Sequence, residues 1–339
     1  MSSYNDNFNE AKKLHALGKI KEAQKLYEKT VKNKNDDYLV LNLLATTFLQ
    51  LKKYDRAIEN FTKSIDLNPK YPESFNNRGI AYAEIQSYGL AIKDYNEAIS
   101  LNKNYFSAHL NKAISLKNSQ KFNQAIDCFN ACIKINPKDP SIYNNLGNLY
   151  VKLGKNDEAY TAYEKAIILK NDFAIVHSNR GDLNFSLRKY DLALKDFSNA
   201  LKFNDSLDYV YGKYINTKMC INQWDNFDFD IKKLKGDIKE NKKIVNPYYL
   251  LYLIDSPELH KQVAQLYSNI KCKKKSKSSS KLIMGQKIKL GYFSADFKNH
   301  AVLHLMLDVF KNHDKSKFEI YGFNHSTSRD EMTKIVSKY

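Results

Sequence analysis

Residues 54–69 read YDRAIENFTKSIDLNP, in which Ala57, Phe61 and Ser64 fall on one face at helical spacing. Pro69 follows at a point where a helix must stop. The segment recurs every 34 residues, which is the mark of a repeat architecture. The repeated alanines are Ala23, Ala57, Ala91, Ala125, Ala159 and Ala193. Four positions after each alanine is an aromatic residue: Tyr27, Phe61, Tyr95, Phe129, Tyr163 and Phe197. Seven positions after each alanine is a mostly small residue: Thr30, Ser64, Ala98, Cys132, Ala166 and Ala200.

This periodicity is the tetratricopeptide pattern, in which each repeat is a pair of helices. The small residues let the two helices approach closely, and the aromatic fills the space toward the next repeat. We therefore predict a mainly α chain, with six tetratricopeptide repeats over residues 1–207 forming a superhelix. Earlier in the repeat, one position of the first helix is glycine or alanine, which also lets the two helices of the repeat approach closely. The residues at this position are Ala45, Gly79, Ala113, Gly147 and Gly181.

The sixth position of the first helix of each repeat is usually asparagine, a polar residue without an obvious structural need there. We expect the first helices to line the inner wall of the superhelix, so that these side chains form a ladder. An asparagine amide both donates and accepts, and can therefore grip the backbone of an extended polypeptide. The alternative is that the position merely tolerates polarity in an asparagine-rich chain. The second repeat breaks the pattern with Leu43, and the ladder residues are Asn9, Asn77, Asn111, Asn145 and Asn179.

The charge balance is strongly basic, with 54 Lys and Arg against 37 Asp and Glu in 339 residues. Such a balance attracts nucleic acid, anionic membranes or acidic proteins. The basic residues are scattered, and no nucleic-acid reading helix or RNA-binding signature accompanies them, so we do not expect a nucleic-acid partner. The N-terminus lacks secretory features, and the apolar run 248–254 is too short to span a bilayer. We expect a cytoplasmic protein without a membrane segment.

The cysteines form neither a CxxC pair nor a dense framework, so neither disulfides nor a zinc site is expected. Cys132 occupies a small-residue packing position of the repeat, which predicts a buried, reduced thiol. The four cysteines are Cys128, Cys132, Cys220 and Cys272.

The repeat pattern weakens after residue 207. Residues 208–270 are predicted to form a degenerate repeat, with Phe227 in place of the alanine, and a helical connecting region. Residues 271–286 are rich in Lys and Ser and are predicted to be a linker. Residues 287–294 and 318–324 are predicted strands, and 304–312 and 330–339 predicted helices. Their order implies a parallel sheet, with ligands beyond the carboxyl ends of the strands, where 294–300 would lie.

The stretch 291–306, GYFSADFKNHAVLHLM, and the strand 317–324 resemble protein O-linked N-acetylglucosamine transferases. The resemblance implies that 287–339 begin the first lobe of a two-lobed, metal-independent (GT-B) glycosyltransferase. It also implies that His300 is a candidate catalytic base, since a neutral imidazole can accept a hydroxyl proton. Asp296 either supports His300 or serves as a turn residue. His300 and His304 lie four residues apart and could share a metal, but the sequence offers no third ligand nearby, so a metal site is not expected. His304 is expected to pack against the sheet.

The family transfers a sugar from a nucleotide donor to Ser or Thr of proteins recruited by the repeats. The expected donor is UDP-N-acetylglucosamine, while relatives in the superfamily also use GDP-fucose. No donor-binding residue is expected within 287–339, because the lobe that holds the nucleotide would follow them. We therefore expect a truncated chain that is inactive by itself. The alternative is a non-enzymatic adaptor that binds extended polypeptides through its repeats.

Overall fold

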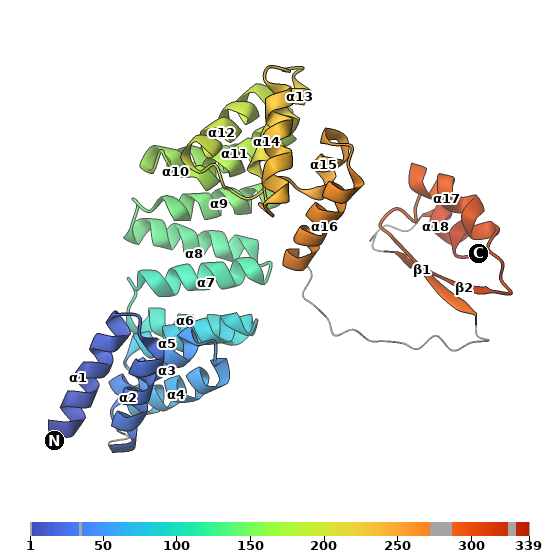
Figure 1. The fold of residues 1–339 in the computed structure, drawn as a ribbon. Coiled ribbons are helices and arrows are strands. Elements are labelled where there is room, and N and C mark those ends of the chain that lie inside the picture. The colour runs from blue at the N-terminus through green and yellow to red at the C-terminus, as the bar shows by residue number, and fades with distance from the viewer. Residues whose placement is uncertain (1, 34–35, 272–286, 325–329, 339) are drawn as a thin grey trace. The chain divides into compact units, whose positions relative to one another are not determined.

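The computed structural model describes residues 2–33, 36–271, 287–324 and 330–338, and divides the chain into two units, Met1–Lys273 and Lys274–Tyr339 (Figure 1). The predicted linker 271–286 lies almost wholly outside the described residues, as does Cys272. In the described part of the chain, no helix is long and apolar enough to cross a membrane.

Helices alone make up the described part of the first unit, and from α1 to α14 each helix packs against the next (Figure 1). They are α1 (Ser2–Ala16), α2 (Ile20–Asn33), α3 (Tyr38–Gln50), α4 (Tyr54–Leu67), α5 (Pro72–Glu84), α6 (Tyr88–Leu101), α7 (Phe106–Asn118), α8 (Phe122–Ile135), α9 (Pro140–Lys152), α10 (Asn156–Leu169), α11 (Ala174–Ser186), α12 (Tyr190–Phe203), α13 (Val210–Cys220), α14 (Phe227–Lys239), α15 (Pro247–Leu253) and α16 (Pro257–Lys271).

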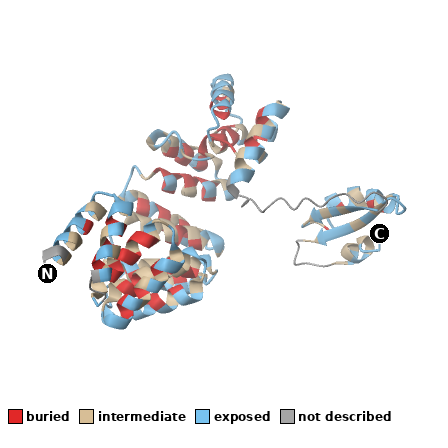
Figure 2. Ribbon diagram, turned by 60° about the horizontal axis from the view of Figure 1, so that its bottom comes forward, coloured by how far each residue is buried: buried red, intermediate tan, exposed pale blue. Residues whose placement is uncertain are grey.

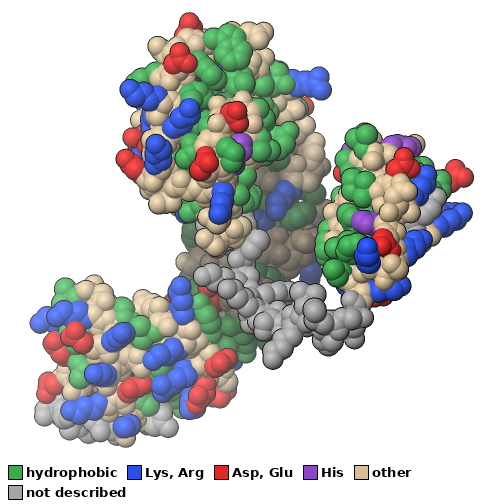
Figure 3. All heavy atoms as spheres, turned by 45° about the vertical axis from the view of Figure 1, so that its right-hand side comes forward, with side chains coloured by type: hydrophobic (Ala, Val, Ile, Leu, Met, Phe, Trp, Pro, Cys, Tyr) green, Lys and Arg blue, Asp and Glu red, His purple; other side chains and the backbone are tan. Residues whose placement is uncertain are grey.

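The predicted tetratricopeptide superhelix is confirmed, and its repeated residues form the core. All six repeat alanines are fully buried, and each of the six aromatics is at most 2% exposed. Figure 2 shows the buried residues on the helix faces that meet inside the first unit. Cys128 and Cys132 are buried free thiols, as the packing position of Cys132 predicted, and burial raises the pKa of Cys132 to about 12. On the face drawn in Figure 3, basic and acidic side chains are interspersed over the first unit.

Glycine in the first helix is required by the aromatic residue of the second. A Cβ atom built on Gly79 would lie 2.6 Å from the ring of Tyr95, and one on Gly181 would lie 2.8 Å from the ring of Phe197. Real Cβ atoms do not approach so closely, because the van der Waals contact distance is about 3.5–4.0 Å. Helix spacing within these repeats is therefore set by a ring that packs directly on backbone.

The turn between the two helices of each repeat places one residue in the left-handed conformation. The next residue donates its N–H back to the first helix, as Ser87 N does to Tyr82 O at 2.9 Å, which closes the helix end. The position recurs with the 34-residue period and extends to the turn between α13 and α14. Its occupants have φ between 55° and 74°, and only two are glycines: Gly18, Lys52, Gln86, Gln120, Gly154, Arg188 and Asn222.

Glycine at this position is expected to stabilise the repeats. A side chain costs roughly 1–2 kcal/mol in the left-handed region, and glycine gives back part of that as unfolded-state entropy. Gln86→Gly and Gln120→Gly should each raise the free energy of unfolding by about 0.5–1 kcal/mol. Urea denaturation measures this. Gly154→Ala is the control of opposite sign, and a loss of stability in both glutamine variants would contradict the argument.

The α13–α16 region has its own apolar core, which includes Ile215, Leu234 and Leu250. One ion pair lies at its edge. Lys218 Nζ lies 2.7 Å from Asp230 Oδ2, and the two side chains are only 7% and 10% exposed. The hydroxyl of Tyr211 donates to Asp230 Oδ1 at 2.8 Å. Each member of this cluster therefore compensates the burial of another.

The second unit is a strand–helix–strand–helix segment, as the sequence predicted. Strands β1 (Ile288–Ser294) and β2 (Phe318–Asn324) are parallel, with Ile288 paired to Phe318 and Ser294 to Asn324. Helix α17 (Ala301–Lys311) connects the strands, and α18 (Glu331–Val336) follows β2. Phe297, Leu303 and Phe310 form the core between the sheet and the helices.

The first helix of this unit begins earlier than predicted. We expected a helix over 304–312, but α17 begins at Ala301 because His300 caps it: Nδ1 of His300 accepts the N–H of Val302. The expectation that His304 packs against the sheet is wrong, since His304 is exposed and its ring hydrogen-bonds Oδ1 of Asn299 at 2.9 Å.

Candidate functional site

The first helices of the repeats form a continuous wall, in which α3 touches α5, α5 touches α7 and α9 touches α11. The predicted ladder asparagines stand on this wall, half-buried except for Asn9, which is exposed. We name the wall, with its asparagines at the fifth and sixth helix positions, the ladder face.

Three of the five ladder asparagines bond to asparagines one position earlier in the preceding repeat. Each bond spans 35 residues and joins two first helices. The fifth-position asparagines were not anticipated from the sequence, although they share the 34-residue register of the sixth-position ladder. The three Nδ2-to-Oδ1 bonds are Asn77 to Asn42 at 3.4 Å, Asn111 to Asn76 at 3.0 Å, and Asn179 to Asn144 at 2.9 Å.

The ladder changes at Asn145, because Leu110 replaces the asparagine one position earlier in the preceding repeat. The amide of Asn145 donates to Ser141 O within its own helix at 2.9 Å, and its Oδ1 accepts from Lys117 Nζ at 3.0 Å. A lysine therefore joins α7 to α9 where asparagine pairs join the other repeats.

The ladder amides retain capacity for a ligand. An asparagine side chain has two N–H donors and an oxygen with two lone pairs. At Asn111 and Asn179, one donor goes to the neighbouring repeat. Beside Asn179 the wall is hollowed, with a cavity of about 220 Å³ that Asn148, Val151, Asp182 and Ser186 also line. The ladder face thus offers partly unsatisfied amides next to open volume.

In the second unit, the turn after β1 presents His300 and Asp296 on the surface. His300 and Asp296 are 46% and 36% exposed, and 3.9 Å separates Nδ1 from Oδ2. This distance is an ion-pair contact and is too long for a hydrogen bond. Nδ1 instead accepts from Val302 N at 3.3 Å, which places the proton of the neutral ring on Nε2. Before His300 can accept a proton from a hydroxyl, one ring nitrogen must be free of both a proton and a hydrogen bond. Either the bond from Val302 N–H to Nδ1 must break, or the ring proton must move from Nε2 to Nδ1.

Helix α18 holds this turn from the other side. Asp330, its N-cap residue, accepts the N–H of Asn299 at 2.6 Å, and the hydroxyl of Thr333 donates to Phe297 O at 2.6 Å. The N–H of Asn299 holds the pKa of Asp330 below its ordinary value. The turn is therefore held by α18 at Phe297 and Asn299, directly before His300.

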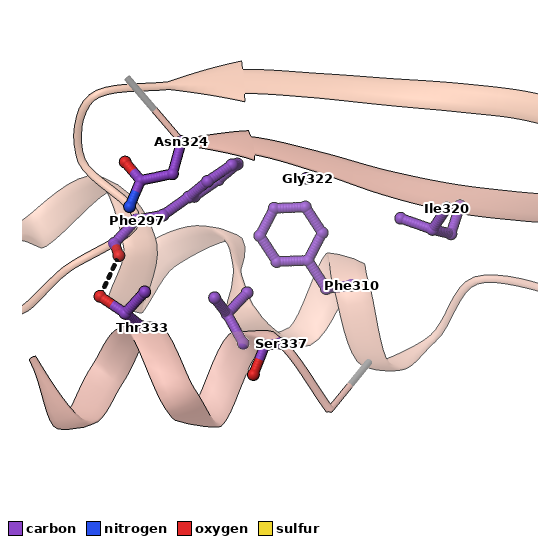
Figure 4. A pocket seen from close by; sticks show the side chains of 8 residues that line it. Phe297, Phe310, Ile320, Gly322, Asn324, Thr333 and Ser337 are labelled. Atoms are coloured by element: carbon purple, nitrogen blue, oxygen red, sulfur yellow. Dashed lines mark hydrogen bonds between the residues drawn. The ribbon is translucent and has the colours of Figure 1, made fainter. Parts of the chain in front are cut away.

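A cavity of about 290 Å³ lies beneath β2 (Figure 4). Phe297 lines it from the turn after β1, Phe310 from α17, and Ile320 and Asn324 from β2, with Thr333 of α18 below. His300 is not among the residues that line it. The cavity is thus separate from the candidate base.

His300, in the turn, and His304, in α17, each form a hydrogen bond within the protein. His300 caps α17 and His304 bonds to Asn299. Across the described ranges, no group of three or more His, Cys, Asp or Glu residues is placed to hold a metal ion.

Comparisons match the repeats and the C-terminal residues to models of different families. Models described as "TPR repeat" and "Tetratricopeptide repeat" match residues 45–86, 115–154 and 147–187, and residues 72–105. A model described as "Glycosyl transferase family 41" matches residues 248–339, which include β1, the His300 turn and α17. The chain therefore combines tetratricopeptide repeats with a C-terminal portion similar to that glycosyltransferase family.

Solved structures resemble the repeats. A tetratricopeptide repeat protein from Parabacteroides merdae is 18% identical and has a TM-score of 0.57, over 79% of this chain and all of its own. MamA is 25% identical with a TM-score of 0.46, over 48% of this chain and 94% of its own. MamA from Desulfovibrio magneticus is 20% identical with a TM-score of 0.47, over 50% and 97%. The first of these supports the fold. No curated protein matches the chain.

Proposed function

We propose that this chain supplies the polypeptide-binding repeats and the beginning of the catalytic region of a protein O-linked glycosyltransferase. The observation that carries the proposal is the family 41 match over residues 248–339, on the same chain as the asparagine-lined repeats. The match includes the turn that holds His300 at the carboxyl end of a parallel strand. Ligands bind at such strand ends in α/β sheets.

The reaction would be a displacement at the anomeric carbon of a nucleotide sugar. A Ser or Thr hydroxyl of the bound polypeptide attacks that carbon, the bond to the nucleoside diphosphate breaks, and His300 takes the hydroxyl proton. The proposed donor is UDP-N-acetylglucosamine, and GDP-fucose is the second donor to be tested. The ladder face would hold the polypeptide by its backbone and so accept many sequences.

The test uses the reading frame that encodes this chain, expressed to its stop codon. Each radiolabelled donor is incubated with the protein and a Ser/Thr peptide. Sugar transfer is expected where the expressed protein includes the donor-binding lobe, and His300→Phe should then lower the rate about 10²–10⁴-fold, the usual contribution of a general base. His304→Phe is the matched control, since His304 is also exposed, lies in α17, and contacts Asn299 instead.

A second function, that of a non-enzymatic adaptor, rests on the ladder face alone. Peptide binding without transfer from either donor would favour it over the transferase. Equal transfer rates in the His300 and His304 variants would remove His300 from the mechanism and leave the family assignment standing.

A further inference from the structure

Two lysines occupy the ladder face at the middle of the repeats. Lys117 is the twelfth residue of α7, and Lys152 is the thirteenth residue of α9, 35 residues later. The same two positions of the 34-residue repeat meet in the first two repeats, where His15 and Gln50 are hydrogen-bonded at 3.0 Å. The fold therefore places two lysines at repeat positions whose side chains meet in the first two repeats.

Four other cations of the first helices have carboxylate partners. Arg78, Arg180, Lys213 and Lys218 lie 2.6–2.8 Å from the carboxylates of Asp94, Asp196, Asp182 and Asp230. Among the residues that the structure describes, neither Lys117 nor Lys152 forms an ion pair. A half-buried cation without a counter-charge is costly, so a carboxylate supplied from outside would be favoured there.

The surroundings of the two ammonium groups are electropositive. Burial and the positive charge of Lys152 both lower the pKa of Lys117. Lys117 donates to Asn145 Oδ1, and Lys152 Nζ lies 5.4 Å from the centre of the Phe122 ring. Neither contact neutralises the charge. Farther along the same wall, Asp182 and Lys213 compensate each other at 2.7 Å.

We propose that Lys117 and Lys152 form a subsite for an acidic side chain of the polypeptide that lies along the ladder face. The proposal rests on the proposed polypeptide-binding function and specifies its preferred substrates: extended segments carrying Asp or Glu. The asparagines would hold the backbone in any register, and the lysine pair would fix the register at one acidic residue. Such a segment would bind more tightly than its neutral counterpart.

The test compares two fluorescent peptides of Ser, Thr and Ala, about 15 residues long and blocked at both ends, that differ only in a central Glu or Gln. About 15 residues extend over roughly 50 Å, long enough to cover several repeats. Because backbone recognition allows the peptide to shift, a single central Glu can reach the lysines. Fluorescence anisotropy with the full chain should show about five- to ten-fold tighter binding of the Glu peptide, weakening as salt rises.

Lys152→Gln and Lys117→Gln should each reduce the ratio of Glu-peptide to Gln-peptide affinity, and together abolish the preference. Lys152 is exposed, so its variant is expected to fold normally. Lys165→Gln in α10, also at an exposed lysine, makes the same change of net charge and should keep the preference. Equal affinity of both peptides for the unmodified chain, or an equal loss in the Lys165 variant, would overturn the subsite alone. Failure of both peptides to bind would overturn the ladder function as well.

Discussion

Alanine at Asn77, Asn111 and Asn145 together is expected to weaken binding of an extended peptide roughly 100-fold. A hydrogen bond contributes about 1 kcal/mol net, so three amides that grip the peptide backbone contribute about 3 kcal/mol. The measurement is fluorescence anisotropy with the neutral Ser, Thr and Ala peptide. The sequence alone implied nearly unchanged thermal stability. The observed bonds from Asn77 and Asn111 to the preceding repeats add a cost of about 1–3 kcal/mol in unfolding free energy.

The partners of these amides provide the control. Asn42 and Asn76 are buried at 4% and 3% exposure and accept the bonds from the ladder residues. Alanine at both positions breaks the same contacts between repeats while leaving the ladder amides in place. This variant should lose stability yet retain most of its affinity. If it loses as much affinity as the ladder variant, the asparagines act by holding the superhelix together, and the proposed backbone grip is wrong.

Lys218→Met is expected to lower the free energy of unfolding by about 3–5 kcal/mol. The substitution leaves the carboxylate of Asp230 buried, with only the hydroxyl of Tyr211 to compensate it. Amide hydrogen exchange should show the loss concentrated in α13–α16, whose apolar core adjoins the pair. Urea denaturation gives the overall value.

A double variant separates the lost charge pair from lost packing. Lys218→Met with Asp230→Leu removes both charges and fills the volume with apolar atoms, so most of the stability should return. A double variant as unstable as the single one would mean that packing, not the unpaired carboxylate, carries the effect. This cluster has no signal in the sequence, because the two residues lie twelve apart on different helices.

The repeats could be predicted closely because the sizes of their side chains recur with the period of the fold. A buried alanine, a buried aromatic and a glycine in contact with that aromatic recur with one period, and each has a steric reason. The parallel strands could be predicted from alternation and order. The early start of α17 could not, since histidine is an uncommon helix cap and its role depends on where Val302 N–H points.

The candidate sites were located in the sequence more readily than their contacts. The 34-residue spacing identified the ladder positions, yet gave no sign that their amides already bond to neighbouring asparagines. For the same reason the Lys117 and Lys152 pair was missed: two residues 35 apart become neighbours only when successive first helices stack with an offset of one residue. The distance from His300 to Asp296 likewise depends on how the turn closes.

The asparagine bonds between repeats give the superhelix a mechanical property. Each of them crosses a joint at which one repeat rotates relative to the next, and each involves an amide that a threaded chain would also contact. A polypeptide bound there would change the angle between neighbouring repeats, and with it the pitch and stiffness of the superhelix. Each repeat contacts only its neighbours. The effect of a polypeptide bound along the ladder face would therefore pass from one repeat to the next along the superhelix.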